Sequence, residues 1–138
     1  MFQIVISPLT RELLALAEHG MPERQAMISI MDHRRDAKTR YPAPRVLRLC
    51  FDDAVENSFW QNLMTEEQAV AIRDFVRRYG EETDLLLIHC TEGVSRSAAV
   101  VAGILTGLCR DASWIWSDSR YCPNPLVYRL VTEAFQKG

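Results

Sequence analysis

The sequence predicts an α/β fold, with a central, mostly parallel sheet of four to five strands flanked by helices. Short runs of branched apolar residues alternate along the chain with amphipathic segments, which is typical of strand–helix–strand units whose strands pair in parallel. In the stretch Leu85–Ser97, four such apolar residues lead into the polar loop Cys90–Arg96, and a new apolar run starts at Ala98. This pattern places an anion-binding loop between the last parallel strand and a buried helix.

Length and composition predict one soluble domain spanning residues 1–138. The net charge of -2 gives no attraction to nucleic acids or membranes, so neither is expected as a partner. No apolar run has the length of a membrane span, and the N-terminus lacks a basic leader, so we expect a cytoplasmic protein. The four cysteines show no metal-type pairing and are expected to be free thiols in a reducing compartment: Cys50, Cys90, Cys109 and Cys122.

The first part of the chain is predicted to form a strand, a helix and a second strand. Residues Phe2–Ile6 form the first strand, and Ser7-Pro8 supplies N-cap and first-turn chemistry for a helix that ends at Gly20. The run Gln25–Met31 is typical of a buried strand. This order implies parallel pairing.

The segment from Asp32 to Arg45 is polar, basic and interrupted by two prolines, which predicts a surface loop before a third strand at Val46–Phe51. One interpretation is a solvated linker. The other is that its cations border a pocket and attract an anionic substrate: Arg34, Arg35, Lys38 and Arg40.

The second half of the chain is mainly helical. A capping box at Thr65–Gln68 begins an amphipathic helix that runs to Gly80 and forms the crossover to the central strand. The run Ala98–Cys109 is apolar nearly all round and should form the most buried helix. A short helix is predicted within Asp111–Tyr121, and the last helix opens at Asn124-Pro125.

The loop carries side chains suited to holding a phosphoryl group. Backbone N–H groups at a helix start have no internal partners and carry the positive end of the dipole. Beside a cation, a thiol in such a place has its pKa lowered from about 8.5 to roughly 3.5–7.5, so Cys90 should be a thiolate at neutral pH. Arg96 offers a planar fork for two phosphoryl oxygens, Gly93 permits the backbone turn, and Ser97 can place a hydroxyl near the sulfur.

The pattern His-Cys-x5-Arg-Ser at His89–Ser97 resembles the signature of the cysteine-dependent protein tyrosine phosphatases, especially the small dual-specificity branch. The resemblance implies a phosphatase-type anion loop, with Cys90 as nucleophile and with Ser97 assisting its departure. The substrate-binding residues it implies are Thr91, Glu92, Gly93, Val94, Ser95 and Arg96. We expect Glu92 to point outward, because an inward carboxylate would repel phosphate.

The same resemblance implies roles for residues outside the loop. An aspartate after a strand should protonate the departing oxygen; Asp53 fits this pattern better than Asp52. His89 would orient the loop, or is an ordinary core histidine, and Asn124 would support the loop, or only caps the last helix. Phe59 and Trp60 could line the pocket or join the core.

The implied function is hydrolysis of phosphomonoesters through a phosphocysteine, with a phosphorylated protein or peptide as partner and phosphate or other oxyanions as ligands. No cofactor or metal is expected, because Arg96 and the backbone dipoles supply the positive charge. Alternatives are an RNA 5′-phosphate or phosphoinositide substrate, and a phosphopeptide-binding module without turnover. Rhodanese-like sulfurtransferases also have a cysteine loop after a strand, but that loop is shorter by one residue, so the seven-residue loop of this chain matches phosphate better.

A further hypothesis concerns redox control. Cys50 is a candidate resolving thiol that could form a disulfide with an oxidised Cys90.

Overall fold

The computed structural model describes residues 2–32, 43–56 and 61–138. Four strands form one sheet in the order β1-β4-β2-β3, and every neighbouring pair is parallel. This result confirms the predicted α/β class. The strands are β1 (Gln3–Pro8), β2 (Gln25–Met31), β3 (Val46–Cys50) and β4 (Leu85–Cys90).

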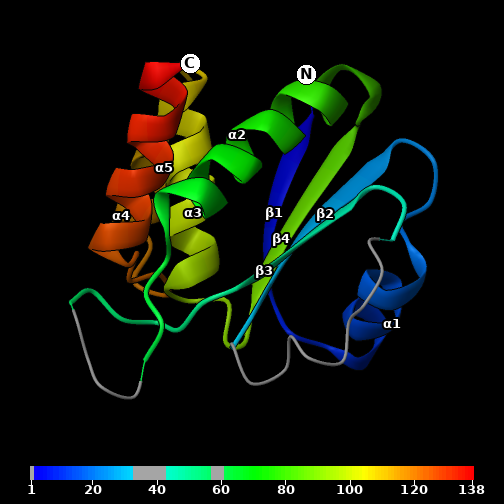
Figure 1. Ribbon diagram of the computed structural model, residues 1–138, viewed down its shortest axis with the longest axis horizontal. Helices are drawn as coiled ribbons and strands as arrows, with labels where there is room; N and C mark the ends of the chain where they lie inside the picture. Colours follow the sequence, from blue (N-terminus) through cyan, green and yellow to red (C-terminus); the bar gives the residue numbers. More distant parts are fainter. Residues whose placement is uncertain (1, 33–42, 57–60) are drawn as a thin grey trace.

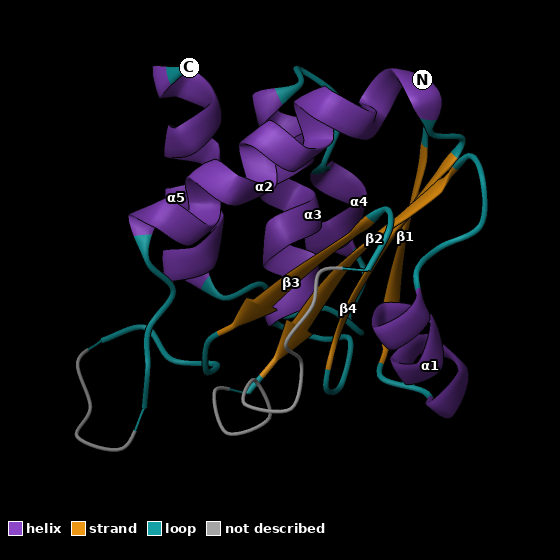
Figure 2. Ribbon diagram, turned by 45° about the vertical axis from the view of Figure 1, so that its right-hand side comes forward, coloured by secondary structure: helices purple, strands orange, loops and turns teal. Residues whose placement is uncertain are grey.

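Helices cover the sheet unequally on its two faces (Figures 1 and 2). The helix α1 (Arg11–His19) lies on one face, where a small cluster of buried residues includes Ala17 and Met27. The larger core lies on the opposite face. The helices of that face are α2 (Glu66–Tyr79), α3 (Arg96–Gly107), α4 (Ser113–Ser117) and α5 (Pro125–Lys137).

The strand β4 lies between β1 and β2, so the first two strands of the chain are parallel without pairing with each other. Leu85 is level with Gln3 of β1 on one side and with Gln25 of β2 on the other. Because all four strands run the same way, their carboxyl ends meet at one edge, where ligands bind in open parallel sheets. The loop after β4 therefore opens beside the ends of β1 and β2, with the end of β3 one strand further away.

The first helix begins later than predicted. We expected Ser7 as its N-cap, but β1 continues to Pro8, which is level with Cys90 of β4. Thr10 is the N-cap instead, and its side chain accepts a hydrogen bond from the Leu13 N–H. Pairing with β4 holds Ser7 extended, and Thr10 offers the same capping chemistry one turn later.

The two helices that flank β4 in sequence follow the predicted pattern. The capping box of α2 is present at Thr65 and Gln68, and the chain continues from α2 through a short 3₁₀ helix, η2 (Gly80–Glu82), into β4. In α3, every residue from Arg96 to Leu105 is buried. This burial fixes the start of α3, and so the donors of the preceding loop, against the sheet. Within the described ranges, no helix is both long and apolar enough to cross a membrane.

Candidate active site

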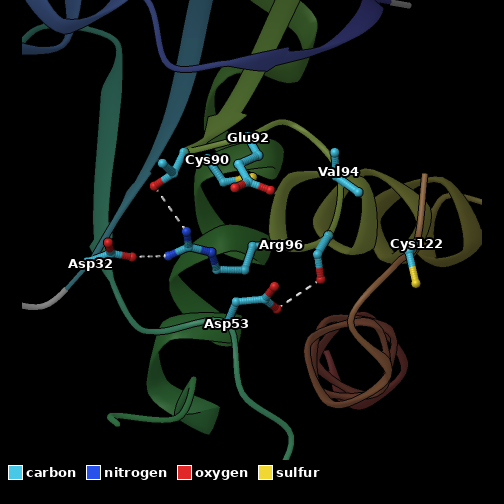
Figure 3. Close-up of a pocket in the computed structure, with 9 residues that line it drawn as sticks. Asp32, Asp53, Cys90, Glu92, Val94, Arg96 and Cys122 are labelled. Carbon is cyan, nitrogen blue, oxygen red and sulfur yellow. Dashed lines mark hydrogen bonds and ion pairs between the residues drawn. The ribbon is translucent and has the colours of Figure 1, made fainter. Parts of the chain in front are cut away.

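A cavity of about 450 Å³ lies at the carboxyl edge of the sheet, above the start of α3 (Figure 3). The strand ends, the loop after β4 and the segment before α5 all contribute to its wall. The residues that line it are Asp32, Asp53, Cys90, Thr91, Glu92, Val94, Ser95, Arg96 and Cys122.

The thiol of Cys90 lies at the base of this cavity, with 2% of the residue exposed. Ser97 Oγ is 3.1 Å from its Sγ, and the Gly93 N–H donates to the same sulfur over 3.3 Å. Burial raises the pKa of Cys90, but the hydroxyl and N–H of Ser97, the N–H of Gly93 and the charge of Arg96 together bring that pKa below its ordinary value. The sulfur is therefore poised as a nucleophile.

Gly93 gives the loop its shape. Its φ is +71°, in the left-handed region. A Cβ here would lie 2.6 Å from the Pro8 nitrogen and 2.8 Å from the Ser7 carbonyl carbon. Only glycine fits both the angle and the close approach to β1. This tight turn is what directs the Gly93 N–H at the sulfur.

The guanidinium of Arg96 is buried, with 7% of its side chain exposed, and is held by the residues that directly follow three neighbouring strands. Nη1 donates to Asp32 Oδ1 over 2.7 Å and to the Phe51 carbonyl over 2.8 Å, while Nη2 donates to Thr91 Oγ1 over 3.1 Å (Figure 3). Asp32 follows β2, Phe51 follows β3 and Thr91 follows β4. The sheet edge thus fixes the guanidinium plane.

These bonds leave one edge of the Arg96 guanidinium available. Both Nη1 hydrogens and one Nη2 hydrogen are used, so the Nε–H and the second Nη2–H have no partner among the described residues. The Nε–H and that Nη2–H point the same way from one edge of the plane, with the spacing of two phosphoryl oxygens. This edge of the guanidinium can therefore hold two oxygens of an anion beside Cys90.

The two candidate acids differ in what they contact. Asp53 lines the cavity, and its Oδ1 accepts hydrogen bonds from Ser95 Oγ and Asn124 Nδ2, both over 2.8 Å. Asp52 is buried, and its Oδ2 accepts the Asn62 N–H over 2.7 Å. Asp53 thus lies at the cavity, whereas Asp52 braces the loop that carries it.

Asn124 joins this acid loop to both the anion loop and α5. Its Oδ1 caps α5 by accepting the N–H groups of Leu126 and Val127, and its Nδ2 reaches Asp53 and the Ala54 carbonyl. Its backbone N–H donates to the Ser95 carbonyl over 3.2 Å. Asn124 therefore caps α5, as one interpretation of the sequence predicts. Its side chain holds the segment that carries Asp53, and its backbone N–H contacts the anion loop.

No protein-family model and no curated protein sequence matches this chain. Solved structures do. PTPMT1 in complex with PI(5)P has a TM-score of 0.60 at 15% identity, over 97% of this chain and 90% of that one. The human tyrosine phosphatase-like serine/threonine/tyrosine-interacting protein has a TM-score of 0.59 at 19% identity, over 94% of this chain and 89% of that one. Human DUSP28 has a TM-score of 0.58 at 14% identity, over 97% of this chain and 92% of that one.

The fold is that of the small protein tyrosine and dual-specificity phosphatases. Each alignment covers more than nine-tenths of this chain, so the likeness includes the sheet and the helices that position the anion loop. The signature at His89–Ser97 led to the same fold from the sequence alone.

Within this phosphatase fold, His89 is fully buried and bonded to the neighbouring strand. Its Nε2 lies 2.7 Å from Ser29 Oγ of β2, and its Nδ1 lies 3.5 Å from the Cys90 carbonyl. The Ser29 hydroxyl can donate to Nε2 or accept from it, so this short contact suits either tautomer of a neutral ring. Burial, followed by the charge of Arg96, lowers the pKa of His89, so the ring is neutral.

Sequence reasoning missed two residues of this site. The sequence predicts only a surface loop at Asp32 and only a strand at Ser29. In the structure, Asp32 binds Arg96 and Ser29 binds His89. One signal could have indicated Asp32, because a polar residue directly after a buried parallel strand lies at the ligand-binding edge. Glu92 is exposed and lines the cavity, and it makes no hydrogen bond or ion pair with another described residue.

The redox hypothesis for Cys50 is wrong in this fold. The strand β2 separates β3 from β4, which puts Cys50 and Cys90 about 10 Å apart, beyond the reach of a disulfide. Leu49 pairs with Ile30, which is level with Cys90, so Cys50 faces the opposite side of the sheet from Cys90.

Six residues for which the sequence left two interpretations lie outside the described residues. They are the basic side chains of the polar loop and the two aromatic residues that could line the pocket or join the core: Arg34, Arg35, Lys38, Arg40, Phe59 and Trp60.

Proposed function

We propose that this protein is a cysteine-dependent phosphatase that hydrolyses phosphomonoesters of proteins. One observation carries the proposal: a buried thiol of lowered pKa and the open edge of a buried guanidinium share one cavity in a phosphatase fold. A thiolate supplies the nucleophile for a phosphoryl group, and the guanidinium supplies two donors for its oxygens.

In the first step, the Cys90 thiolate attacks phosphorus in line with the ester oxygen, so an S–P bond forms and the P–O bond breaks. The Nε–H and Nη2–H of Arg96 and the loop N–H groups hold the equatorial oxygens as negative charge spreads over them. Asp53 gives its proton to the departing oxygen, which leaves as an alcohol or phenol.

In the second step, water attacks the phosphocysteine and phosphate is released. Asp53, now a carboxylate, accepts a proton from the water, and the S–P bond breaks. Ser97 Oγ, 3.1 Å from the sulfur, donates to the thiolate as it departs. The two steps return Cys90 and Asp53 to their starting protonation states.

The substrate class we propose is phosphotyrosine together with phosphoserine and phosphothreonine in proteins. Among the described residues, the cavity of about 450 Å³ is only partly enclosed, which favours a shallow pocket. A shallow pocket admits short phosphorylated side chains as well as long ones.

Hydrolysis of p-nitrophenyl phosphate tests the proposal. We expect phosphate release by the wild-type protein and none by Cys90→Ser. The matched control is Cys109→Ser, an exposed cysteine just beyond the C-terminal end of α3, which should retain full activity. Binding of a phosphotyrosine peptide without turnover by the wild-type protein would favour a binding module instead.

A second candidate is hydrolysis of phosphoinositides, which the complex of PTPMT1 with PI(5)P favours, because that structure shares this fold. Parallel assays with a phosphotyrosine peptide, a phosphoserine peptide and PI(5)P separate the candidates. A kcat/KM at least tenfold higher on PI(5)P than on either peptide would replace the protein substrate in our proposal.

A further inference from the structure

We propose that Asp32 is a positioning residue that orients the Arg96 guanidinium toward the phosphoryl group; this inference rests on the proposed phosphatase function. Asp32 Oδ1 accepts from Nη1 over 2.7 Å, on the edge opposite the one left open. Asp32 has 48% of its side chain exposed and Arg96 only 7%, so the carboxylate reaches inward from the cavity wall to a buried cation (Figure 3).

The buried cation needs such a partner. A charge removed from water is costly unless it is paired and hydrogen-bonded, and the other two acceptors of Arg96 are neutral, a carbonyl and a hydroxyl. Asp32 supplies the charged acceptor. Its bond also prevents rotation about the terminal bonds of the side chain, which would turn the Nε–H and Nη2–H edge away from the anion.

The topology makes this support rigid. Asp32 directly follows β2, which pairs with both β3 and β4, so the carboxylate stands between the Phe51 carbonyl and Thr91. Three acceptors on adjacent strand ends fix a plane better than acceptors on one mobile loop. A displacement of the guanidinium by about 1 Å is enough to lower catalysis by about a hundredfold.

The other carboxylates of the cavity have different contacts. Asp53 is bound by Ser95 and Asn124, and Glu92 bonds to no described residue. Within the described ranges, Asp32 is the acidic residue that contacts Arg96. A carboxylate in this cavity repels a thiolate and a phosphate dianion, so its benefit has to come through the cation that it holds.

These two effects of Asp32 have opposite signs, which makes the proposal testable. If Asp32 acted only as a negative charge, its removal would lower the pKa of Cys90 and tighten oxyanion binding. If Asp32 holds Arg96 in place, its removal frees the cation to turn away, so the pKa of Cys90 rises and oxyanion binding weakens.

The experiment compares Asp32→Ala, Asp32→Asn and the wild-type protein. The control is Asp84→Asn, which breaks an exposed pair with Arg24 at the other end of β4. Three quantities are measured: kcat/KM on p-nitrophenyl phosphate, the inhibition constant of vanadate, and the pKa of Cys90 from the pH dependence of its alkylation.

For Asp32→Ala we expect kcat/KM to fall by about ten- to a hundredfold, vanadate to bind about tenfold more weakly, and the pKa of Cys90 to rise. Asp32→Asn keeps an oxygen acceptor for Nη1 but removes the charge, so its losses should be clearly smaller than those of Asp32→Ala without reaching the wild-type values. Asp84→Asn should leave all three quantities unchanged. If Asp32→Ala does not fold, Asp32→Ser takes its place, since a serine hydroxyl is too short to reach Nη1.

Tighter vanadate binding with a lower pKa of Cys90 in Asp32→Ala would overturn the proposal. So would equal losses in Asp32→Ala and Asp32→Asn with an unchanged pKa of Cys90, which indicate a merely structural role. A wild-type protein that neither turns over p-nitrophenyl phosphate nor binds vanadate would overturn the proposed function instead.

Discussion

Three donors converge on a single sulfur atom in this protein. The hydroxyl and backbone N–H of Ser97 and the backbone N–H of Gly93 all lower the pKa of Cys90, and they act against the burial that raises it. Two of them belong to the backbone and cannot be removed by substitution. The hydroxyl of Ser97 can, so it offers the cleanest test of how the thiolate is stabilised.

We predict that Ser97→Ala raises the pKa of Cys90, because the variant loses the donor 3.1 Å from the sulfur. The pH midpoint of iodoacetamide alkylation should shift upward, and breakdown of the phosphocysteine should become the slow step, visible as a burst of p-nitrophenol. Ser113→Ala, in the exposed helix α4, is the control. An unchanged midpoint would contradict the prediction.

The adjacent aspartates should respond differently to substitution. Asp53→Asn cannot donate or accept the proton, so we predict a loss of kcat of about a hundredfold or more on phenyl phosphate, and a smaller loss on p-nitrophenyl phosphate, whose leaving group needs less help. Asp52→Asn should instead lower the free energy of unfolding by about 1–3 kcal/mol, because the buried Asp52 carboxylate accepts the Asn62 N–H and the amide is a weaker acceptor. A reversed pattern would transfer the acid role to Asp52.

At the level of residues, the sequence predicts the parts of the site that are close together in the chain. Cys90, Gly93, Arg96 and Ser97 lie within eight positions, so their spacing alone indicates an anion loop. Asp32 is 64 positions from Arg96 and stands in a polar run without periodicity, so nothing local distinguishes it from a solvated residue. Its role depends on strand order, which the sequence does not state.

At the scale of the elements, the hydrogen bond between His89 of β4 and Ser29 of β2 makes the stability of the folded protein depend on pH. Burial holds the pKa of His89 below its ordinary value of 6.5, so the unfolded chain binds a proton that the folded chain does not. Stability is therefore full above about pH 6.5 and falls as the pH drops below it, with a slope of at most about 1.4 kcal/mol per pH unit from this group.

We predict that His89→Asn removes this part of the pH dependence. Urea unfolding at pH 7.5 and pH 5.5 should give a smaller difference in the variant than in the wild-type protein, although the variant is less stable at pH 7.5. An equal difference in the two proteins would assign the pH dependence to other groups.

The contact between α3 and α5 depends on a small residue. A Cβ on Gly103 would lie 2.7 Å from Val131 Cβ, so Gly103→Ala should lower the free energy of unfolding by about 1–2 kcal/mol even though alanine favours a helix. In the double variant with Val131→Ala, the loss should be smaller than the sum of the two single losses. Chemical denaturation of the four proteins measures this coupling, and strict additivity would contradict it.

Helices and strands with strong periodicity are predicted well from this sequence, but the sequence does not predict which of them lie next to each other in the fold. The capping box of α2 and the apolar run of α3 are local signals and were found. The N-cap of α1 was placed at Ser7 instead of Thr10, because two adequate caps stand close together and only the pairing of Pro8 with Cys90 decides between them. The insertion of β4 between β1 and β2 has no signal in either strand.

On the scale of the molecule, the two apolar clusters share one sheet, so we predict that the chain unfolds in a single transition, with coincident curves from circular dichroism and tryptophan fluorescence. Vanadate at a hundred times its Kd should stabilise the fold by about 2.7 kcal/mol, because it binds the folded state alone. Arg96→Ala should abolish this shift. Two separate transitions would contradict the shared core.

The close contact of Gly93 with Ser7 and Pro8 means that the anion loop is shaped from outside as well as from its own sequence. The seven residues from Cys90 to Arg96 would therefore not keep their shape if they were transferred to another protein. In a host protein that lacks a strand corresponding to β1, the loop would adopt a different conformation, and its backbone N–H groups would no longer point toward the sulfur. The grafted segment would keep the motif but lose its affinity for oxyanions.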